Sequence, residues 1–213
     1  MIQALREFYG LQPTPPADLF QFLVWEIVSE HALPARRDLA WQALKRIPAL
    51  TPDAMFRAPA QALSDAVGMA GPHRDEKIDR IRATVGQFRR HRDRFDVDTL
   101  RSGSPWAAGR AFRRLTHFSR ATRARAHLFA LEALVLPIDE DMNRVVGRLT
   151  GVPPHRNRRP VRRWLCAQLS HDAGAFREAV IYLRHHAQHT CLKAAPHCSV
   201  CPLRTRCDYA KPS

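Results

Sequence analysis

Four of the five cysteines in this chain of 213 residues lie close together near its end, at Cys191, Cys198, Cys201 and Cys207. The segment reads CLKAAPHCSVCPLRTRC, a spacing of C-x6-C-x2-C-x5-C. Such clustering differs from the disulfide framework of a secreted protein and favours a metal centre in a reducing compartment. Because thiolates are soft ligands, the spacing alone allows either a tetrahedral zinc ion or a [4Fe-4S] cluster. Cys166 lies outside the pattern, and we interpret it as a small core residue.

The charge of the chain is strongly positive, with a formal net charge of +14 from 34 Lys and Arg against 20 Asp and Glu. Such an excess attracts polyanions, and nucleic acid is the commonest one, because each phosphate that is neutralised releases counterions. The rival partner is a membrane surface. Against it, the most apolar stretch, residues 126–138, contains His127 and Glu132 and is shorter than the roughly 20 residues that span a bilayer. Residues 1–10 lack the apolar core of a signal peptide, which indicates a cytosolic protein.

The spacing of apolar residues is helical through most of the sequence, and no stretch alternates over six residues as a half-buried strand would. The chain is therefore predicted to be all-α. Its first strong helix follows the proline-rich residues 12–16, with Asp18 as N-cap. Residues 101–106 are expected to form a loop. Further helices are expected at residues 35–47, after Thr51-Pro52, at 59–67, 75–91, 106–115 and 119–136, and in three more places toward the C-terminus.

The cysteine spacing, at the end of an all-helical chain, resembles the iron-sulfur loop of endonuclease III and its adenine-specific relatives, the helix-hairpin-helix DNA glycosylases. The resemblance implies that the four cysteines bind a [4Fe-4S] cluster. It also implies that the loop between the first two cysteines presents basic residues to DNA phosphate. Lys193 and His197 occupy that loop here, and the alternative is an exposed, solvated loop.

The stretch LVLPIDEDMNRVVGRLTGV, residues 134–152, resembles the segment in which this family places a catalytic aspartate, and Asp139 is that residue here. Breaking an N-glycosidic bond builds positive charge on the sugar, which a carboxylate beside the anomeric carbon stabilises. The alternative role of Asp139 is an N-cap, because it directly precedes a predicted helix, and both roles can coexist. Asp141 is expected to act electrostatically on the same helix N-terminus.

Residues 115–122, LTHFSRAT, lie where the family has its hairpin, typically L-P-G-V-G-R-K-T. Arg120 and Thr122 match and are expected to contact DNA. His117 and Ser119 replace the two glycines that let the backbone approach a phosphate. Ala121 replaces the lysine that forms a Schiff base in bifunctional members, so lysine-dependent strand cleavage is not expected. Nearby arginines could compensate by forming a phosphate-binding surface, and the alternative is that they lie on ordinary solvated helix faces. They are Arg110, Arg113, Arg114, Arg120, Arg123 and Arg125.

Two segments of the N-terminal half also resemble the family. In residues 22–33, FLVWEIVSEHAL, His31 stands where the family has the glutamine that fills the gap left by the extruded base. Glu26 aligns with the glutamate that protonates the departing base in adenine glycosylases, and a partnership with an arginine is the equal alternative. Residues 67–78, VGMAGPHRDEKI, resemble the loop that wedges into the duplex, with Met69, His73 or Arg74 as the intruding side chain.

The resemblance implies an all-α, two-domain helical DNA glycosylase fold. Residues 17–133 would form a six-helix barrel domain with a degenerate helix-hairpin-helix. Residues 134–213, with residues 1–16 packing back, would form an iron-sulfur cluster domain, and DNA would lie across the groove between the two. Residues 99–114 form a longer segment than in typical members.

The predicted function is that of a divergent, monofunctional DNA glycosylase in base excision repair. The protein would act as a cytoplasmic, nucleoid-associated monomer that flips a damaged or mismatched base out of double-stranded DNA and hydrolyses its N-glycosidic bond. One alternative is a catalytically weak or inactive iron-sulfur paralogue that recognises damaged or distorted DNA. The other is a basic structural protein that holds zinc. The sequence does not name the base, because pocket contacts set that choice.

Overall fold

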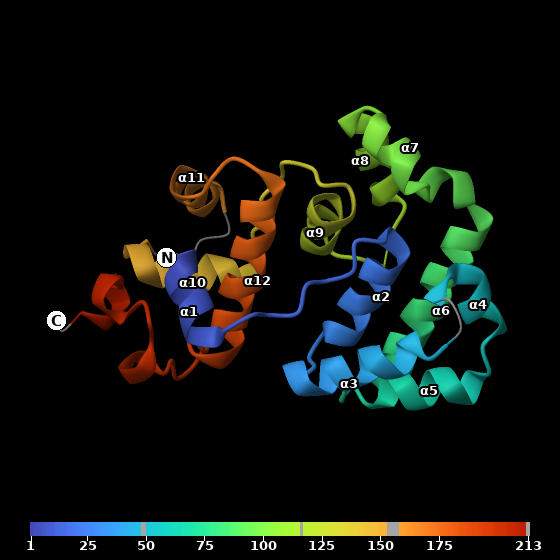
Figure 1. Ribbon diagram of the computed structural model, residues 1–213, viewed down its shortest axis with the longest axis horizontal. Coiled ribbons are helices and arrows are strands. Elements are labelled where there is room, and N and C mark those ends of the chain that lie inside the picture. Colours follow the sequence, from blue (N-terminus) through green and yellow to red (C-terminus); the bar gives the residue numbers. More distant parts are fainter. Residues whose placement is uncertain (48–49, 116, 153–157, 212–213) are drawn as a thin grey trace. The chain divides into compact units, whose positions relative to one another are not determined.

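The computed structural model describes residues 1–47, 50–115, 117–152 and 158–211. Within these ranges the chain consists of α-helices and short 3-10 turns joined by loops, without any strand, which confirms the all-α prediction (Figure 1). Packing divides the chain into two compact units. We call Pro15–Glu132 the central unit, and Met1–Thr14 with Ala133–Ser213 the terminal unit.

The central unit is built around α2, which packs against α3, α6 and α9 (Figure 1). Nine of the eleven residues of α2 are buried, as expected for a helix that is apolar on all sides and lies in a core. No helix in the described part of the chain is both long and apolar enough to cross a membrane. The helices of this unit are α2 (Leu19–Ser29), α3 (Pro34–Lys45), α4 (Pro52–Arg57), α5 (Ala60–Gly68), α6 (Arg74–Arg90), α7 (Val97–Ser102), α8 (Pro105–Arg113) and α9 (Arg120–Ala130), with the 3-10 turn η2 (Arg92–Phe95).

Helix starts in the central unit follow local capping chemistry. Asp18 accepts a hydrogen bond from the Gln21 amide at 2.8 Å and begins α2, as predicted. Thr51 accepts from the Ala54 amide at 3.2 Å, and Pro52 follows it as the first residue of α4. Such caps satisfy amides that have no partner inside the helix, and proline loses nothing at that position.

The terminal unit brings together the two ends of the chain. Here α12 packs against α1 and α10, and α10 also contacts α11 and η5 (Figure 1). No helix was predicted for residues 2–9, where α1 lies, because a helix this short is stable only through its packing. The elements of this unit are α1 (Ile2–Tyr9), α10 (Glu140–Thr150), α11 (Arg159–Gln168), α12 (Ala173–His189), η3 (Cys198–Val200), η4 (Arg204–Arg206) and η5 (Asp208–Ala210).

Two predicted boundaries in residues 99–136 were wrong. The helix expected at 119–136 ends at Ala130, and the left-handed backbone of Glu132, with φ 55°, turns the chain out of the helix. The loop expected at 101–106 is shorter, because α7 runs to Ser102 and Ser104 already caps α8. Leucines and alanines past residue 130 keep helical spacing, so periodicity alone overestimated the length of α9.

Candidate functional site

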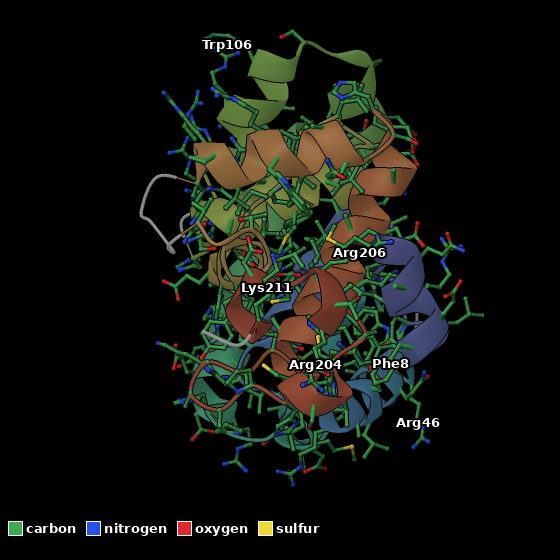
Figure 2. The ribbon with its side chains drawn as sticks, turned by 90° about the vertical axis from the view of Figure 1, so that its left-hand side faces the viewer. Phe8, Arg46, Trp106, Arg204, Arg206 and Lys211 are labelled. Carbon is green, nitrogen blue, oxygen red and sulfur yellow. The ribbon has the colours of Figure 1, made fainter. Side chains whose placement is uncertain are left out.

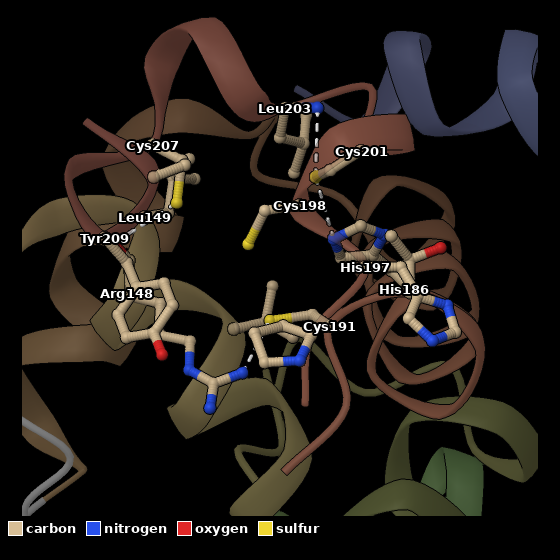
Figure 3. A pocket seen from close by; sticks show the side chains of 14 residues that line it. Arg148, Leu149, His186, Cys191, His197, Cys198, Cys201, Leu203, Cys207 and Tyr209 are labelled. Carbon is tan, nitrogen blue, oxygen red and sulfur yellow. Dashed lines mark hydrogen bonds between the residues drawn. The ribbon is translucent and has the colours of Figure 1, made fainter. Parts of the chain in front are cut away.

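The four clustered cysteines line a single cavity in the terminal unit (Figure 3). Its walls come from α10, from the last turn of α12 and from the segment with η3, η4 and η5. Among the described residues, no three His, Cys, Asp or Glu side chains are placed so that they could hold one metal ion. Both metal centres considered from the sequence, the zinc ion and the [4Fe-4S] cluster, stay predictions.

Hydrogen-bond donors point at two of these sulfurs. The Leu203 amide donates to Cys201 Sγ at 3.4 Å, and Arg148 Nη1 donates to Cys191 Sγ at 3.4 Å. The Arg148 guanidinium also binds the Leu192 carbonyl at 2.6 Å and, through Nη2, the Lys193 carbonyl at 2.9 Å. This donor set suits anionic sulfur ligands, because hydrogen bonds to a thiolate stabilise its charge.

A chain of hydrogen bonds leads from α1 to Cys201. The Tyr9 hydroxyl lies 2.7 Å from His186 Nδ1 and 2.5 Å from Thr190 Oγ1, and His186 Nε2 lies 3.7 Å from Cys201 Sγ. Burial raises the pKa of Tyr9 to about 12 and lowers the pKa of His186 to about 4. A neutral imidazole that accepts from Tyr9 carries its proton on Nε2, which then donates to the sulfur. Sequence analysis missed this contact, because Tyr9 and His186 are 177 positions apart.

Cys201 itself is affected by burial and by its neighbours. Burial raises the pKa of the Cys201 thiol, and the other three cysteines of the cavity raise it further. A thiol whose ionisation is opposed in this way gains from a positive centre beside it.

Asp139 begins α10 as its N-cap. One carboxylate oxygen accepts from the Met142 amide at 2.9 Å, and the other lies 3.1 Å from Arg184 Nε of α12. The side chain keeps 16% of its surface exposed. The cap that the sequence offered as one role of Asp139 is therefore present, and its catalytic role stays a prediction. Asp141 pairs with Arg144 at 2.7 Å, one turn further along the helix.

Glu26 lies in the core of the central unit, with 2% of its surface exposed. The Arg125 guanidinium holds its carboxylate, with Nε 3.0 Å from Oε2. Arg125 also donates to Thr122 Oγ1 at 3.2 Å. The ion pair is thus the alternative that the sequence left open for Glu26, whose role as general acid is untested.

Thr122 is held inside the central unit, and its DNA contact stays a prediction. Its side chain is buried, lies 2.9 Å from the Ser119 hydroxyl and accepts from Arg125. Both residues belong to the start of α9, because Ser119 is the N-cap of that helix and accepts from the Thr122 amide at 3.0 Å. Arg120, its neighbour in the predicted hairpin, is exposed.

The two segments that were predicted to enter the duplex lie side by side. The rings of His31 and His73 are exposed and have centroids 5.4 Å apart. Both residues have left-handed backbone, with φ 53° and 63°, a conformation that costs energy for any residue with a side chain and that often marks functional loops. Met69 is also exposed, and Arg74 pairs with Asp75 at 3.0 Å.

Two cations of α6 support these loops. Lys77 is buried, and its Nζ lies 3.5 Å from the carbonyls of both Val28 and Ala70. Arg80 pairs with Glu30 and donates to the His117 carbonyl at 3.2 Å. Burial lowers the pKa of the Lys77 amine. Sequence analysis passed over both residues, although Lys77 falls on the buried face of α6 by its spacing.

Solved structures of DNA glycosylases share this fold. The chain is similar to endonuclease III in a trapped covalent complex with DNA, with a TM-score of 0.70 and 16% identity over 98% of this chain and 93% of that one. It is also similar to a thermostable thymine-DNA glycosylase, with a TM-score of 0.68 and 13% identity over 98% and 94% of the two chains. For the DNA-3-methyladenine glycosidase from Bacillus halodurans the TM-score is 0.55, with 19% identity over 89% and 84%.

No protein-family model and no curated protein matches the sequence. The structural likeness nevertheless confirms the predicted fold, the helical one of endonuclease III. At these identities the likeness concerns the fold alone.

Proposed function

We propose that this protein is a monofunctional DNA glycosylase, which removes a damaged or mismatched base from double-stranded DNA by hydrolysis. The observation that carries the proposal is Asp139: in a fold shared with DNA glycosylases, a partly exposed carboxylate is held at the first turn of α10 by an amide and an arginine. The +14 charge supports a polyanionic partner. The exposed pair His31 and His73 supports a contact inside the duplex.

The reaction that we propose is a hydrolysis at the anomeric carbon. The N-glycosidic bond breaks, the oxygen of a water molecule bonds to that carbon, and a proton from the water goes to the departing base. Positive charge develops on the sugar in between, and the Asp139 carboxylate stabilises it. The Met142 amide and Arg184 keep the carboxylate in one orientation, so little reorganisation is needed when the charge appears.

The chain has no lysine at the position from which bifunctional members of the family cleave the strand through a covalent imine. Ala121 there lies in the first turn of α9, and its methyl group is no nucleophile. The arginines nearby stay protonated, which makes them poor substitutes. We therefore propose base release that leaves an intact abasic strand.

We further propose that Cys191, Cys198, Cys201 and Cys207 hold a [4Fe-4S] cluster. The cluster would supply a structural cross-link among the elements that carry these four cysteines. Arg148, His186 and the Leu203 amide lie ready to donate hydrogen bonds to the sulfur ligands. Lys193, in the loop between the first two cysteines, is our candidate for a phosphate contact.

Duplexes that carry a panel of damaged or mismatched bases test the enzyme proposal, with half of each sample treated with alkali to cut at abasic sites. We expect cuts only after alkali. Asp139→Asn should lower base release by roughly 10²–10³-fold, because the carboxylate charge is lost, and leave DNA binding intact. Asp141→Asn is the matched control in the same helical turn, and its base release should stay at the level of the unaltered protein.

Two outcomes would overturn this assignment. Cuts without alkali would show an amine nucleophile elsewhere in the chain. Absence of release on every duplex, together with tight salt-dependent binding, would instead support a DNA-binding protein without activity. The burial of Glu26 against Arg125 favours that second candidate. Glu26 aligns with the glutamate that protonates the departing base in adenine glycosylases, and here its carboxylate is held by an arginine.

A matched pair of cysteine variants tests the metal centre. The purified protein should be brown and absorb near about 400 nm, as thiolate-bound iron does. Cys207→Ser should lose most of this absorption, and Cys166→Ser should keep it. A colourless protein that contains zinc would refute the cluster.

A further inference from the structure

The stretch that precedes and includes α9 is free of acidic residues. Between Asp98 and Glu132 the sequence contains seven arginines and no aspartate or glutamate. A solvated helical surface usually mixes both signs of charge, so a run of one sign over this length marks a surface for a charged partner.

Among the described residues, the seven arginines fall into two groups, and only Arg125 pairs with a carboxylate. Three of them are engaged inside the central unit: Arg101 binds the Ala130 carbonyl, Arg123 binds the Leu115 carbonyl and Arg125 binds Glu26. The four that remain are exposed, and none of them has an ion pair within the described part of the chain: Arg110, Arg113, Arg114 and Arg120.

The helix α8 presents an aromatic ring together with two of these arginines. Trp106, Arg110 and Arg113 follow each other at i, i+4 and i+7 and so share one helix face. Trp106 is 63% exposed, and the Arg110 guanidinium carbon lies 3.9 Å from the centre of its ring. Figure 2 shows the labelled Trp106 clear of the surrounding ribbon. The apolar residues of the other face, Ala108, Ala111 and Phe112, are buried.

This combination has the chemistry of a nucleic-acid contact. Aromatic rings stack on any unpaired base, and flanking arginines bind the backbone phosphates. A membrane surface fits less well, because α8 has already buried its apolar face within the protein and shows one large apolar side chain outward.

We propose that α8 is a DNA contact in which Trp106 stacks on an unpaired base while Arg113 and Arg114 hold the neighbouring phosphates. Arg110 keeps the indole ring in place from its side. The partner is DNA with a gap or an open stretch, where a base is free to stack. The inference rests on the proposed DNA partner but not on base removal, so it holds for an active and an inactive protein alike.

Binding to two DNAs tests this contact, one a fully paired duplex and the other the same duplex with a short single-stranded gap. Trp106→Ala should weaken binding to the gapped DNA by about 10-fold, the effect of losing one stacked base, and change binding to the paired duplex by less than about 2-fold. Arg113→Gln should weaken binding to both DNAs. It should also lower the slope of log affinity against log salt by about 0.9, as the loss of one phosphate contact does.

Tryptophan fluorescence provides a direct readout at the proposed residue. The chain has four tryptophans, of which Trp25 and Trp41 are buried and Trp164 is half-buried. Gapped DNA should quench the fluorescence of the unaltered protein and of the control Trp164→Phe. Trp106→Phe should lose most of that quenching.

The proposal fails if Trp106→Ala binds both DNAs like the unaltered protein and gapped DNA leaves the fluorescence unchanged. It also fails if vesicles of phosphatidylglycerol quench Trp106 and DNA does not, because α8 would then contact lipid. Base release on the lesion duplexes, measured with the same variants, separates these outcomes from a failure of the glycosylase proposal. That proposal depends on Asp139 and not on Trp106.

Discussion

Glu26 and Asp139 both face an arginine, and their surroundings differ. Glu26 of the central unit and its partner Arg125 have side chains that are 2% and 8% exposed. Asp139 of the terminal unit and its partner Arg184 have side chains that are 16% and 26% exposed. The sequence offered a catalytic role for each acid. The side chain of Asp139 is partly exposed, whereas that of Glu26 is enclosed.

The difference teaches that burial, rather than residue type, decides what these acids can do. A charge in a protein core needs a partner, because leaving water costs it several kcal/mol. For Glu26 this partner is Arg125. The Asp139 carboxylate is partly hydrated, so it depends less on its arginine for stabilisation.

Removing Arg125 should have the largest effect. Arg125→Leu leaves the Glu26 charge buried without its partner, and the free energy of unfolding should fall by about 3–5 kcal/mol. The double variant Glu26→Leu with Arg125→Leu should recover much of that loss, because no charge remains to be desolvated. Urea unfolding followed by circular dichroism measures both. A loss below about 1 kcal/mol in the single variant would contradict the enclosed pair.

Removing the cap of α10 should have an intermediate effect. Asp139→Ala leaves the Met142 amide without its acceptor and should lower the free energy of unfolding by about 1 kcal/mol. Asp139→Asn keeps an acceptor oxygen at the same place, so it should lower the free energy of unfolding by only a few tenths as much. If both variants lost the same stability, the cap would not explain the position of Asp139, and its charge would be the stabilising feature.

Removing Arg184 should have the smallest effect. Arg184→Gln breaks a partly exposed ion pair, and such pairs contribute about 0–1 kcal/mol, so the midpoint of urea unfolding should hardly move. The same exchange at Arg125 is the matched comparison. Equal losses at the two positions would remove the distinction between the enclosed carboxylate and the accessible one.

What could be predicted from the sequence was chiefly local. Asp18, Thr51 and Asp139 were recognised as helix starts, because an N-cap depends on residues within one turn. The Glu26 and Arg125 pair joins residues 99 positions apart, and no spacing rule reaches that far. For Glu26 the sequence could state the two possible roles but not choose between them.

The same limit explains the misses in both units. The end of α9 depends on the left-handed turn at Glu132, which has no glycine or asparagine to announce it. Lys77 can be buried because Val28 of α2 and Ala70, two residues past the end of α5, both direct a carbonyl toward it. Tyr9 has a role only once α1 has packed against α12.

The terminal unit is built from two segments that are far apart in the sequence, and this has a consequence for folding during translation. Residues 15–132 can complete their own packing while the later part of the chain is still being translated. α1 is made before α12, against which it packs, and more than 160 residues separate the two helices in the sequence. The apolar side of α1 therefore stays uncovered until α12 has been translated, and it is a binding surface for a chaperone during that time.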